Sequence, residues 1–291
     1  MEGTNPVFAT SDPHWTSNLA AFQALVKKAE AGDREALEQF ALPVEFGEGF
    51  YAFKEYCQKQ DLSQVQYLKG HLSGSLTISF FVKDQTGNLA YQSPVLRELL
   101  VKALGLNGRW QAEVLGELGK KVLIFADEPA LGMLASSSLE VKRADLVADL
   151  NEICRLIQGA GAVLGIHSCD AMDWTILMES QIEVLNLDAY RFGLTLFPCL
   201  EKLKQFLERG GWVAWGIIPT SEEAWAETAD SLWYKLNILW DELAEKGLDK
   251  NWLRERSFIT PACGVGLLKP ELAEHIYQVA GQIAQKLGQA F

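Results

Sequence analysis

The sequence has little positive charge and no long hydrophobic run. Its 26 Lys and Arg residues stand against 38 Asp and Glu residues, which gives a formal net charge of −12. Nucleic-acid binding needs a positive surface that neutralises phosphates, so we expect no nucleic-acid partner. No stretch approaches the ~20 apolar residues of a membrane span, and we expect no membrane partner. Met1–Trp15 lack the basic and apolar segments of a secretory signal, so we expect a cytoplasmic protein.

Two further absences narrow the function. No Gly-x-Gly-x-x-Gly follows an early predicted strand and no Walker loop is present, so the phosphate-binding loops typical of nucleotide-binding proteins are absent from the sequence. The five cysteines are an odd number, which favours free thiols or metal ligands over a disulfide framework. Hydrophobic residues make up 48% of the chain, enough for a large core.

Short β-rich runs alternate along the chain with longer segments of helical period. Several runs (VLIFA, AVLGI, WVAWGII) are almost continuously apolar, which is typical of strands buried on both faces of a parallel sheet. The predicted strands are Pro6–Thr10, Ala41–Phe46, Val65–Leu72, Lys121–Asp127, Ala162–His167, Ile182–Asp188, Trp212–Ile218 and Ser257–Pro261. The predicted helical segments are Leu19–Ala31, Pro94–Leu118, Ala144–Gln158, Pro198–Arg209 and Glu222–Lys246.

This alternation predicts an α/β fold. A closed (β/α)₈ barrel and a doubly wound open sheet both fit an alternation of strands and helices. The count of eight strands favours a single (β/α)₈ TIM barrel, and no linker divides the chain, so we predict one domain over residues 1–291.

In a (β/α)₈ barrel, the loops that leave the carboxyl ends of the strands carry the active site. Polar residues follow the predicted strands at these ends, and a barrel would bring them to one mouth. We predict Asp127 and Glu128 as catalytic carboxylates, although Asp127-Glu128-Pro129 is also typical of a helix start. The predicted substrate-binding residues are Asp127, Ser73, His71, Asp12 and His14.

A candidate metal site comes from three of these strand ends. His167 and Cys169, two residues apart, can project to the same side, and Cys263 follows the last predicted strand. Asp188 ends an apolar strand. The predicted ligands are therefore His167, Cys169, Asp188 and Cys263, a set of N, S, O and S donors suited to Zn²⁺. The alternative that these residues bind no metal stays open, since buried cysteines and strand-end histidines are common in proteins without a metal site.

The predicted donors constrain the chemistry. Neutral His, two thiolates and one carboxylate would leave zinc with one net negative charge, which makes it a poor generator of hydroxide. Such a zinc is better suited to holding a thiol as a nucleophilic thiolate. If the carboxylate is the labile ligand, a substrate sulfur would replace it. The predicted reaction is alkyl transfer to sulfur.

Four motifs in order along the chain resemble the catalytic barrel of cobalamin-independent methionine synthase, within the uroporphyrinogen decarboxylase-like superfamily. The family patterns are K-x-x-L-x-G-P-x-T, D-E-P-A-L, H-x-C and P-x-C-G, and short single-barrel relatives resemble the chain more closely. The first pattern carries Ser75 where proline is usual. The matching segments are Lys69–Thr77, Asp127–Leu131, His167–Cys169 and Pro261–Gly264.

The resemblance implies a zinc-bound thiol that attacks a methyl group. It implies that His167, Cys169 and Cys263 are metal ligands, that Asp188 stands in the place of a glutamate ligand, and that Asp127 holds the amino group of homocysteine. The family also carries an additional N-terminal half, for which this chain has no room, and a histidine after the seventh strand. Residues 216–222 here contain no histidine.

That missing histidine bears on the methyl donor. The amine leaving group of methyltetrahydrofolate needs a proton, whereas the cobalt of a methylcorrinoid does not. We therefore expect a small-molecule thiol substrate, homocysteine first, and a methylated corrinoid protein as partner, with methyltetrahydrofolate in second place. The alternatives are a corrinoid:coenzyme M-type thiol methyltransferase and a non-catalytic corrinoid- or metal-handling barrel. A metal-free decarboxylase is weakly supported, because no arginine lies next to the early strand-end motifs.

Overall fold

The computed structural model describes residues 7–134 and 140–289 of the chain. The chain divides into two compact units. The first consists of Met1–Ala130 and Val141–Gly165, and the second of Leu131–Glu140 and Ile166–Phe291. The boundary between Gly165 and Ile166 falls inside the strand Val163–Ser168, so each unit contains part of the main β-sheet.

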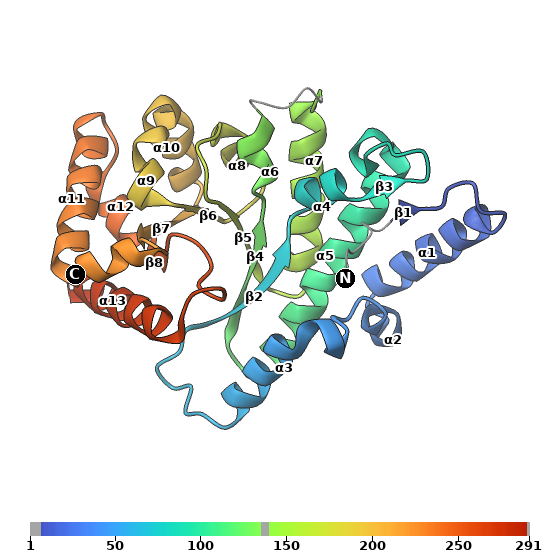
Figure 1. Ribbon diagram of the computed structural model, residues 1–291, viewed down its shortest axis with the longest axis horizontal. Coiled ribbons are helices and arrows are strands. Elements are labelled where there is room, and N and C mark those ends of the chain that lie inside the picture. Colours follow the sequence, from blue (N-terminus) through green and yellow to red (C-terminus); the bar gives the residue numbers. More distant parts are fainter. Residues whose placement is uncertain (1–6, 135–139, 290–291) are drawn as a thin grey trace. The chain divides into compact units, whose positions relative to one another are not determined.

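The main sheet confirms the predicted α/β class. Its six strands are hydrogen-bonded in the order β2-β4-β5-β6-β7-β8 (Figure 1). The pairs β2-β4, β6-β7 and β7-β8 are parallel. The bounds are β2 (Tyr67–Ser73), β4 (Lys121–Asp127), β5 (Val163–Ser168), β6 (Val184–Leu187), β7 (Trp212–Ile218) and β8 (Ser257–Pro261).

The prediction of eight strands in one sheet is wrong in two places. Ala41–Phe46 contains no strand, because Pro43 precedes a helix that begins at Val44. The apolar side chains of Val44 and Phe46 are exposed there, so their alternation reflected no buried sheet face. A proline fixes φ near the helical value and is well tolerated at a helix start.

The first predicted strand is shorter and lies elsewhere. Within the described part of Pro6–Thr10, only β1 (Val7–Phe8) forms a strand. It pairs in parallel with β3 (Lys83–Asp84) in a separate two-stranded sheet. The described residues thus show six parallel strands of the main sheet and not a closed barrel.

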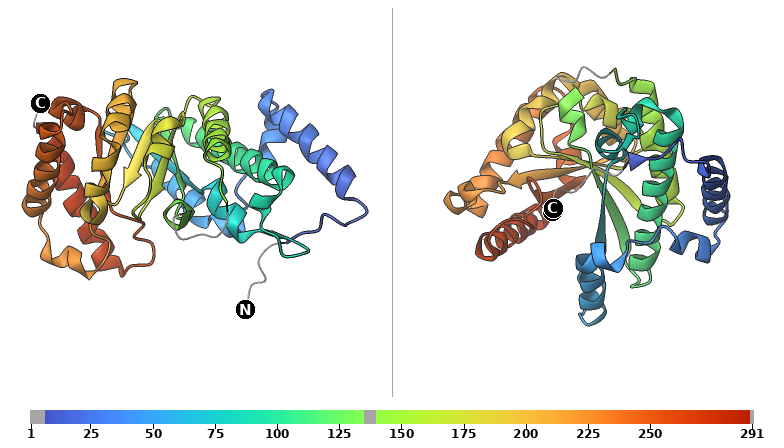
Figure 2. Two further views of the ribbon diagram at one scale, coloured as in Figure 1. Left: turned by 90° about the horizontal axis from the view of Figure 1, so that it is seen from above. Right: turned by 45° about the vertical axis from the view of Figure 1, so that its right-hand side comes forward.

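Helix α5 (Pro94–Gly116) packs against β2 and β4, and helix α7 (Arg143–Gln158) packs against α5 (Figures 1 and 2). Ser93 accepts a hydrogen bond from Leu96 N and so caps α5, whose first residue is Pro94. Ile124 of β4 is fully buried. The other elements of this unit are α1 (Trp15–Glu30), α2 (Arg34–Glu38), α3 (Val44–Gln58), α4 (Ser75–Phe81), η1 (Ala90–Gln92), α5 (Pro94–Gly116) and α7 (Arg143–Gln158).

The second unit is built around Trp215 of β7, which is fully buried against Trp240 of α11. Gly210 and Gly247 end helices with positive φ, a conformation that glycine adopts without steric cost. Helices of this unit are α8 (Thr175–Glu179), α9 (Ala189–Phe192), η3 (Gly193–Cys199), α10 (Leu200–Glu208), η4 (Glu222–Ala226), α11 (Ala229–Glu245), α12 (Lys250–Glu255) and α13 (Pro270–Gln289), and α6 (Ala130–Met133) joins the units.

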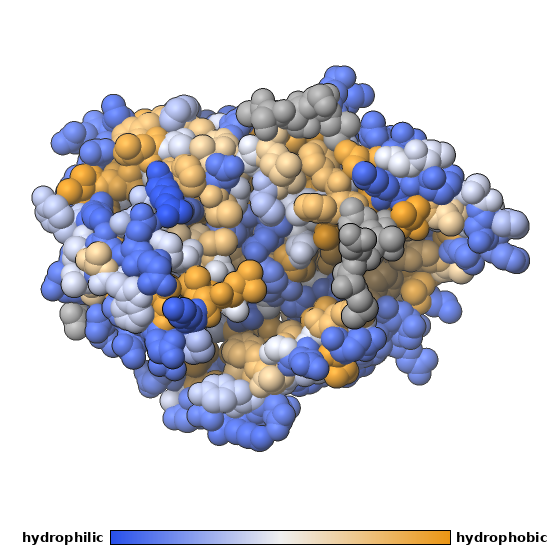
Figure 3. All heavy atoms as spheres, viewed as in Figure 1, coloured by the Kyte–Doolittle hydropathy of each residue, from blue (hydrophilic) through white to orange (hydrophobic). Residues whose placement is uncertain are grey.

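The outer helices are amphipathic. Hydrophilic side chains prevail at the margin of the face shown in Figure 3, as expected where such helices turn their polar side to water. None of the helices in the described part of the chain combines the length and the apolarity needed to cross a bilayer.

Candidate metal centre

His167 and Cys169 lie at the carboxyl end of β5, where the H-x-C spacing predicted them. His167 is the next-to-last residue of the strand, and Cys169 follows its end. Because successive strand side chains point to opposite faces, residues two apart project to the same side. His167 is buried and Cys169 is half-buried.

Cys263 reaches the same place from β8. The backbone N–H of Ala262 donates to Ile218 O at 2.8 Å, which holds the loop after β8 against the end of β7. The pairing of β7 with β8 shifts register between Gly216 and Ile218, beside the site. Cys263, one residue beyond Ala262, is exposed.

Gly216 of β7 makes this approach possible. A Cβ at this position would lie 2.5 Å from Leu187 O and 2.8 Å from Ala262 Cα. Both neighbours are backbone atoms, which cannot rotate away. A glycine here therefore lets the residues before Asp188 and Cys263 come close to β7.

The three side chains form one group of potential metal ligands. A ring nitrogen of His167 and the sulfurs of Cys169 and Cys263 all lie within 4.8 Å of one another. The group lies entirely within the second unit. An imidazole nitrogen and two sulfurs at this spacing could hold one metal ion.

The hydrogen bonds of His167 show which nitrogen is available. Nδ1 lies 2.8 Å from Oδ1 of Asn186. Nε2 is buried and, among the described residues, has no hydrogen-bond partner. A buried polar atom without a partner costs free energy, and a metal ion would relieve that cost. The donors present therefore fit a metal.

The two thiols are electrostatically linked. The Cys169 thiol and the His167 ring lower the pKa of the Cys263 thiol. The pKa of Cys169 is raised by its hydrogen bond with Cys263 and by burial. One thiolate thus forms easily and a second one beside it does not, unless a cation balances both charges.

Asp188 follows β6 but is not in the group of three. Its Oδ1 accepts a hydrogen bond from Arg191 N at 2.9 Å, which caps the short helix α9. Its side chain is buried, and burial raises the pKa of its carboxyl. Cys263 also raises this pKa, so Asp188 lies within the electrostatic reach of the thiol. The predicted role of Asp188 as fourth ligand stays a prediction.

Three predicted substrate residues lie together in the first unit. Ser73 of β2 is paired with Asp127 of β4, and Gly74 N donates to Asp127 O at 2.7 Å. His71 Nε2 lies 3.6 Å from Asp127 Oδ2. The side chains of His71 and Asp127 are 55% and 37% exposed, so a ligand can reach both.

Glu128 is fully buried and faces the start of α4. Its carboxylate accepts hydrogen bonds from Leu76 N at 3.0 Å, from Thr77 N at 2.9 Å and from Thr77 Oγ1 at 2.8 Å. Burial raises the pKa of Glu128 to about 7. Glu128, predicted as a catalytic carboxylate, thus caps the N-terminus of α4.

Asp12 and His14 lie at the start of α1. Asp12 Oδ1 accepts a hydrogen bond from His14 N at 2.7 Å, and both residues are exposed. Their predicted place at the site rested on a first strand within the main sheet. Since β1 pairs with β3 instead, that argument does not apply.

The sequence analysis did not predict two residues of the site, Asn186 and Gly216. Asn186 is buried within β6, and an asparagine inside the apolar run V-L-N-L was the available signal. For Gly216, the signal was a glycine inside a strand pattern, which suggests close backbone approach.

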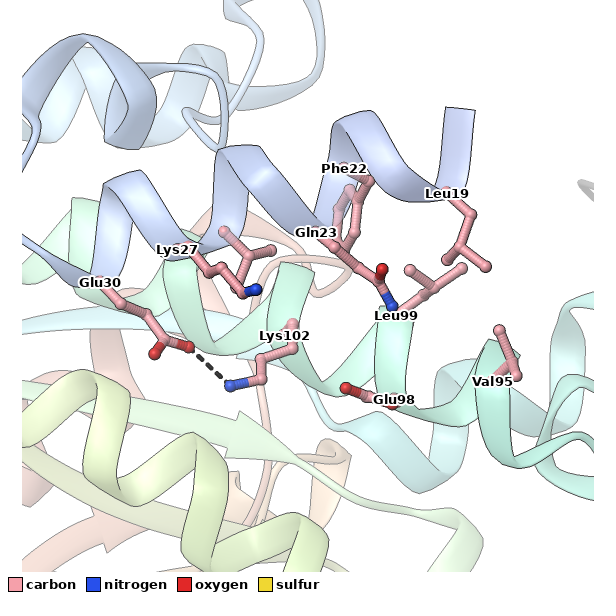
Figure 4. Close-up of a pocket in the computed structure, with 10 residues that line it drawn as sticks. Leu19, Phe22, Gln23, Lys27, Glu30, Val95, Glu98, Leu99 and Lys102 are labelled. Atoms are coloured by element: carbon pink, nitrogen blue, oxygen red, sulfur yellow. Dashed lines mark hydrogen bonds and ion pairs between the residues drawn. The ribbon is translucent and has the colours of Figure 1, made fainter. Parts of the chain in front are cut away.

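A separate pocket lies between α1 and α5 of the first unit (Figure 4). Leu19, Phe22 and Leu99 provide apolar walls, and Lys102 Nζ pairs with Glu30 Oε1 at 2.6 Å. Its lining contains none of the predicted site residues.

Comparison of the chain with models of protein families and with curated proteins finds no match.

Proposed function

We propose that this protein is a zinc-dependent methyltransferase that moves a methyl group to a thiol, with homocysteine as the favoured acceptor and a methylated corrinoid protein as donor. The bare, buried Nε2 of His167 beside the thiols of Cys169 and Cys263 carries the proposal. On this proposal the protein belongs to the methionine synthase-like barrels that the four sequence motifs resemble.

Zinc is the metal that best suits these donors. Thiolate and imidazole ligands favour zinc, whereas magnesium and calcium prefer oxygen. Cys169 and Cys263 as thiolates would balance the charge of the ion, which removes the obstacle to ionising both thiols. His167 would bind through Nε2, because Nδ1 faces Asn186.

Three protein ligands leave a fourth position for a substrate, as in catalytic zinc sites. Zinc, when bound, lowers the pKa of a substrate thiol so that it remains a thiolate at neutral pH. Asp188, buried and within the electrostatic reach of Cys263, would be the labile ligand at this position that the substrate sulfur replaces.

The transfer itself balances without an added acid. The substrate thiol releases its proton to solvent and its sulfur forms a bond to the methyl carbon. The carbon–cobalt bond breaks, and its electron pair stays on cobalt. This leaving group needs no proton, which agrees with the absence of histidine from residues 216–222. Methyltetrahydrofolate remains the second candidate donor.

Asp127 supports an amino-acid thiol as acceptor. Its carboxylate is partly exposed in the first unit and lies near His71. A carboxylate of this kind would bind the ammonium group of homocysteine through charge-assisted hydrogen bonds. Coenzyme M has no ammonium group and would not use Asp127. The proposal thus favours methionine biosynthesis over coenzyme M chemistry.

The proposal keeps a sheet of barrel type, of which the described residues form six strands, and the single domain of residues 1–291 as its structural part. The parallel strands β6, β7 and β8 with their intervening helices support it, because such units build a barrel wall. A cytoplasmic location completes the proposal.

Zinc content and methyl transfer test the function together. We expect one zinc per chain in wild-type protein purified without chelators, and methionine formation from homocysteine and methylcobalamin. Cys263→Ser should lose both. Cys199→Ala is the matched control, because Cys199 is a buried cysteine of the same unit that lies outside the ligand group.

The outcomes separate the alternatives. Zinc without methionine formation, but with methylation of coenzyme M, would move the acceptor to the second candidate. Zinc without methylation of any thiol would favour a non-catalytic metal-handling barrel. Wild-type protein without zinc would refute the proposal.

A further inference from the structure

We infer that Asn186 is a positioning residue that holds His167 in the tautomer with the proton on Nδ1 and so prepares Nε2 as a metal ligand. The inference deepens the proposed function, because it rests on the metal centre of that proposal. It does not depend on which thiol or methyl donor is used.

The hydrogen bonds of Asn186 determine which way its amide points. Its Nδ2 donates to Ala214 O at 2.8 Å and to Thr260 Oγ1 at 3.1 Å. A backbone carbonyl can only accept, so the NH₂ group must face β7. The amide oxygen, Oδ1, is then the atom 2.8 Å from His167 Nδ1. A flipped amide would place two acceptors against each other at Ala214 O.

The amide orientation in turn determines the histidine tautomer. Oδ1 of Asn186 is an acceptor and requires a donor, so Nδ1 of His167 carries the hydrogen. In the neutral ring, Nε2 is then a bare lone pair. That nitrogen is buried and lacks a hydrogen-bond partner among the described residues. Metal-binding histidines commonly donate their other N–H to an oxygen in this way.

The same amide connects the strands that carry the ligands. Asn186 lies on β6 and is in register with Ala214 of β7. Thr260 lies on β8, three residues before Cys263. The hydrogen bonds of one side chain therefore link β5, β7 and β8 within the second unit. Asn186 is buried, so these bonds are not open to competition from solvent.

An asparagine that merely fills the core would give a different result from one that sets the tautomer. Asn186→Leu has a similar volume and removes all three hydrogen bonds. Asn186→Asp keeps an oxygen acceptor toward Nδ1, and in its protonated form it can also donate to Ala214 O. The pair thus separates the volume of the side chain from its hydrogen bonding.

The first measurement is the ¹⁵N chemical shift of the ring nitrogens of His167 in metal-free protein, at a pH where the ring is neutral. The chain has 4 histidines, so His167→Gln identifies the signals. We expect Nδ1–H with bare Nε2 in the wild type and in Asn186→Asp. Asn186→Leu should lose this preference. Wild-type protein with the proton on Nε2 would overturn the inference.

The second measurement is zinc affinity by competition with a chelator. We expect Asn186→Leu to bind zinc about 10–100-fold more weakly, the usual cost of removing an outer-shell partner, and Asn186→Asp to recover part of the loss. A thermal-unfolding scan of each variant establishes that it folds. A folded Asn186→Leu with wild-type tautomer and zinc affinity would overturn the inference.

These readouts need no methyl transfer, so failure of the inference and failure of the proposed function can be told apart. Zinc binding and the Nδ1–H tautomer without thiol methylation would support the role of Asn186 while refuting the proposed reaction. Thiol methylation by the wild type, together with unchanged zinc affinity in folded Asn186→Leu, would support the proposed reaction and refute the role of Asn186.

Discussion

The backbone of Gly216 lies so close to Leu187 that a Cβ on the glycine would fall 2.5 Å from Leu187 O. The same Cβ would lie 2.8 Å from Ala262 Cα. Leu187 and Ala262 directly precede Asp188 and Cys263, so one missing side chain determines how closely two segments of the metal centre approach β7.

Gly216→Ala should therefore damage both the fold and the metal site. We expect a loss of about 1–3 kcal/mol in the free energy of unfolding, because overpacking against backbone cannot be relieved by a rotamer change. Zinc content should fall as Cys263 is displaced. Urea unfolding and zinc analysis check this. Gly281→Ala, where an added Cβ meets no heavy atom within 4 Å in α13, should instead stabilise by about 0.5–1 kcal/mol. Equal unfolding midpoints for wild type and Gly216→Ala would contradict the argument.

Glu128 should make stability depend on pH. Its pKa is raised from an ordinary 4.5 to about 7 in the folded protein. Between these values the folded state keeps the proton and the unfolded chain releases it, so stability falls as pH rises, by up to about 1.4 kcal/mol per pH unit. Glu128→Gln has no such proton, although its amide is a poorer partner for the donors of Thr77.

Urea unfolding at several pH values between 4.5 and 7.5 checks this. At the lowest pH, the free energy of unfolding of the wild type should exceed that of Glu128→Gln. The difference between the two should become smaller toward pH 7. Comparison with the variant also cancels most of the contribution of Asp149, whose pKa is raised to about 6 by burial and whose charge raises the pKa of Glu128. A gap that stays constant with pH would show that Glu128 does not titrate as its burial implies.

Asp188→Asn should keep its zinc. The asparagine oxygen can accept the same hydrogen bond from Arg191 N, so the cap of α9 survives. Since the ligand group consists of His167, Cys169 and Cys263, we expect less than a twofold change in zinc content. Metal analysis beside Cys169→Ser, which should lose zinc, checks this. Loss of zinc in both variants would make Asp188 a fourth ligand.

Asp127→Asn should impair the use of homocysteine selectively. Loss of a hydrogen bond between two charged groups costs about 1.5–3 kcal/mol, or roughly 10–150-fold in kcat/KM. Methylation of a thiol without an amino group should change little. Asp12→Asn is the matched control, an exposed aspartate of the same unit that β1 does not bring to the main sheet. Equal losses with both thiols would remove Asp127 from substrate recognition.

Much of the sheet could be predicted because its strands are unusually apolar. The bounds of β4, β7 and β8 agree with prediction at both ends. Runs such as WVAWGII have no polar face and are too short for a buried helix. Ala41–Phe46 failed because its apolar residues alternate by chance beside a proline that starts a helix.

The structural role of Glu128 could not be predicted from the local sequence. The D-E-P-A-L segment pointed to catalysis or to a helix start of its own. In the structure, Glu128 instead caps α4, a helix that begins more than fifty residues earlier in the chain. Only the parallel pairing of β2 with β4 brings the two together.

The sequence by itself determined the α/β class, most strands of the sheet and the three residues that form the candidate metal group. These follow from local hydrophobic pattern, from the spacing of His167 and Cys169 and from the order of motifs along the chain. The tertiary structure decided the number of strands in the sheet, the free nitrogen of His167 and the contacts of Asn186 and Gly216. Those depend on backbone atoms of strands distant in sequence, whose positions no local pattern encodes.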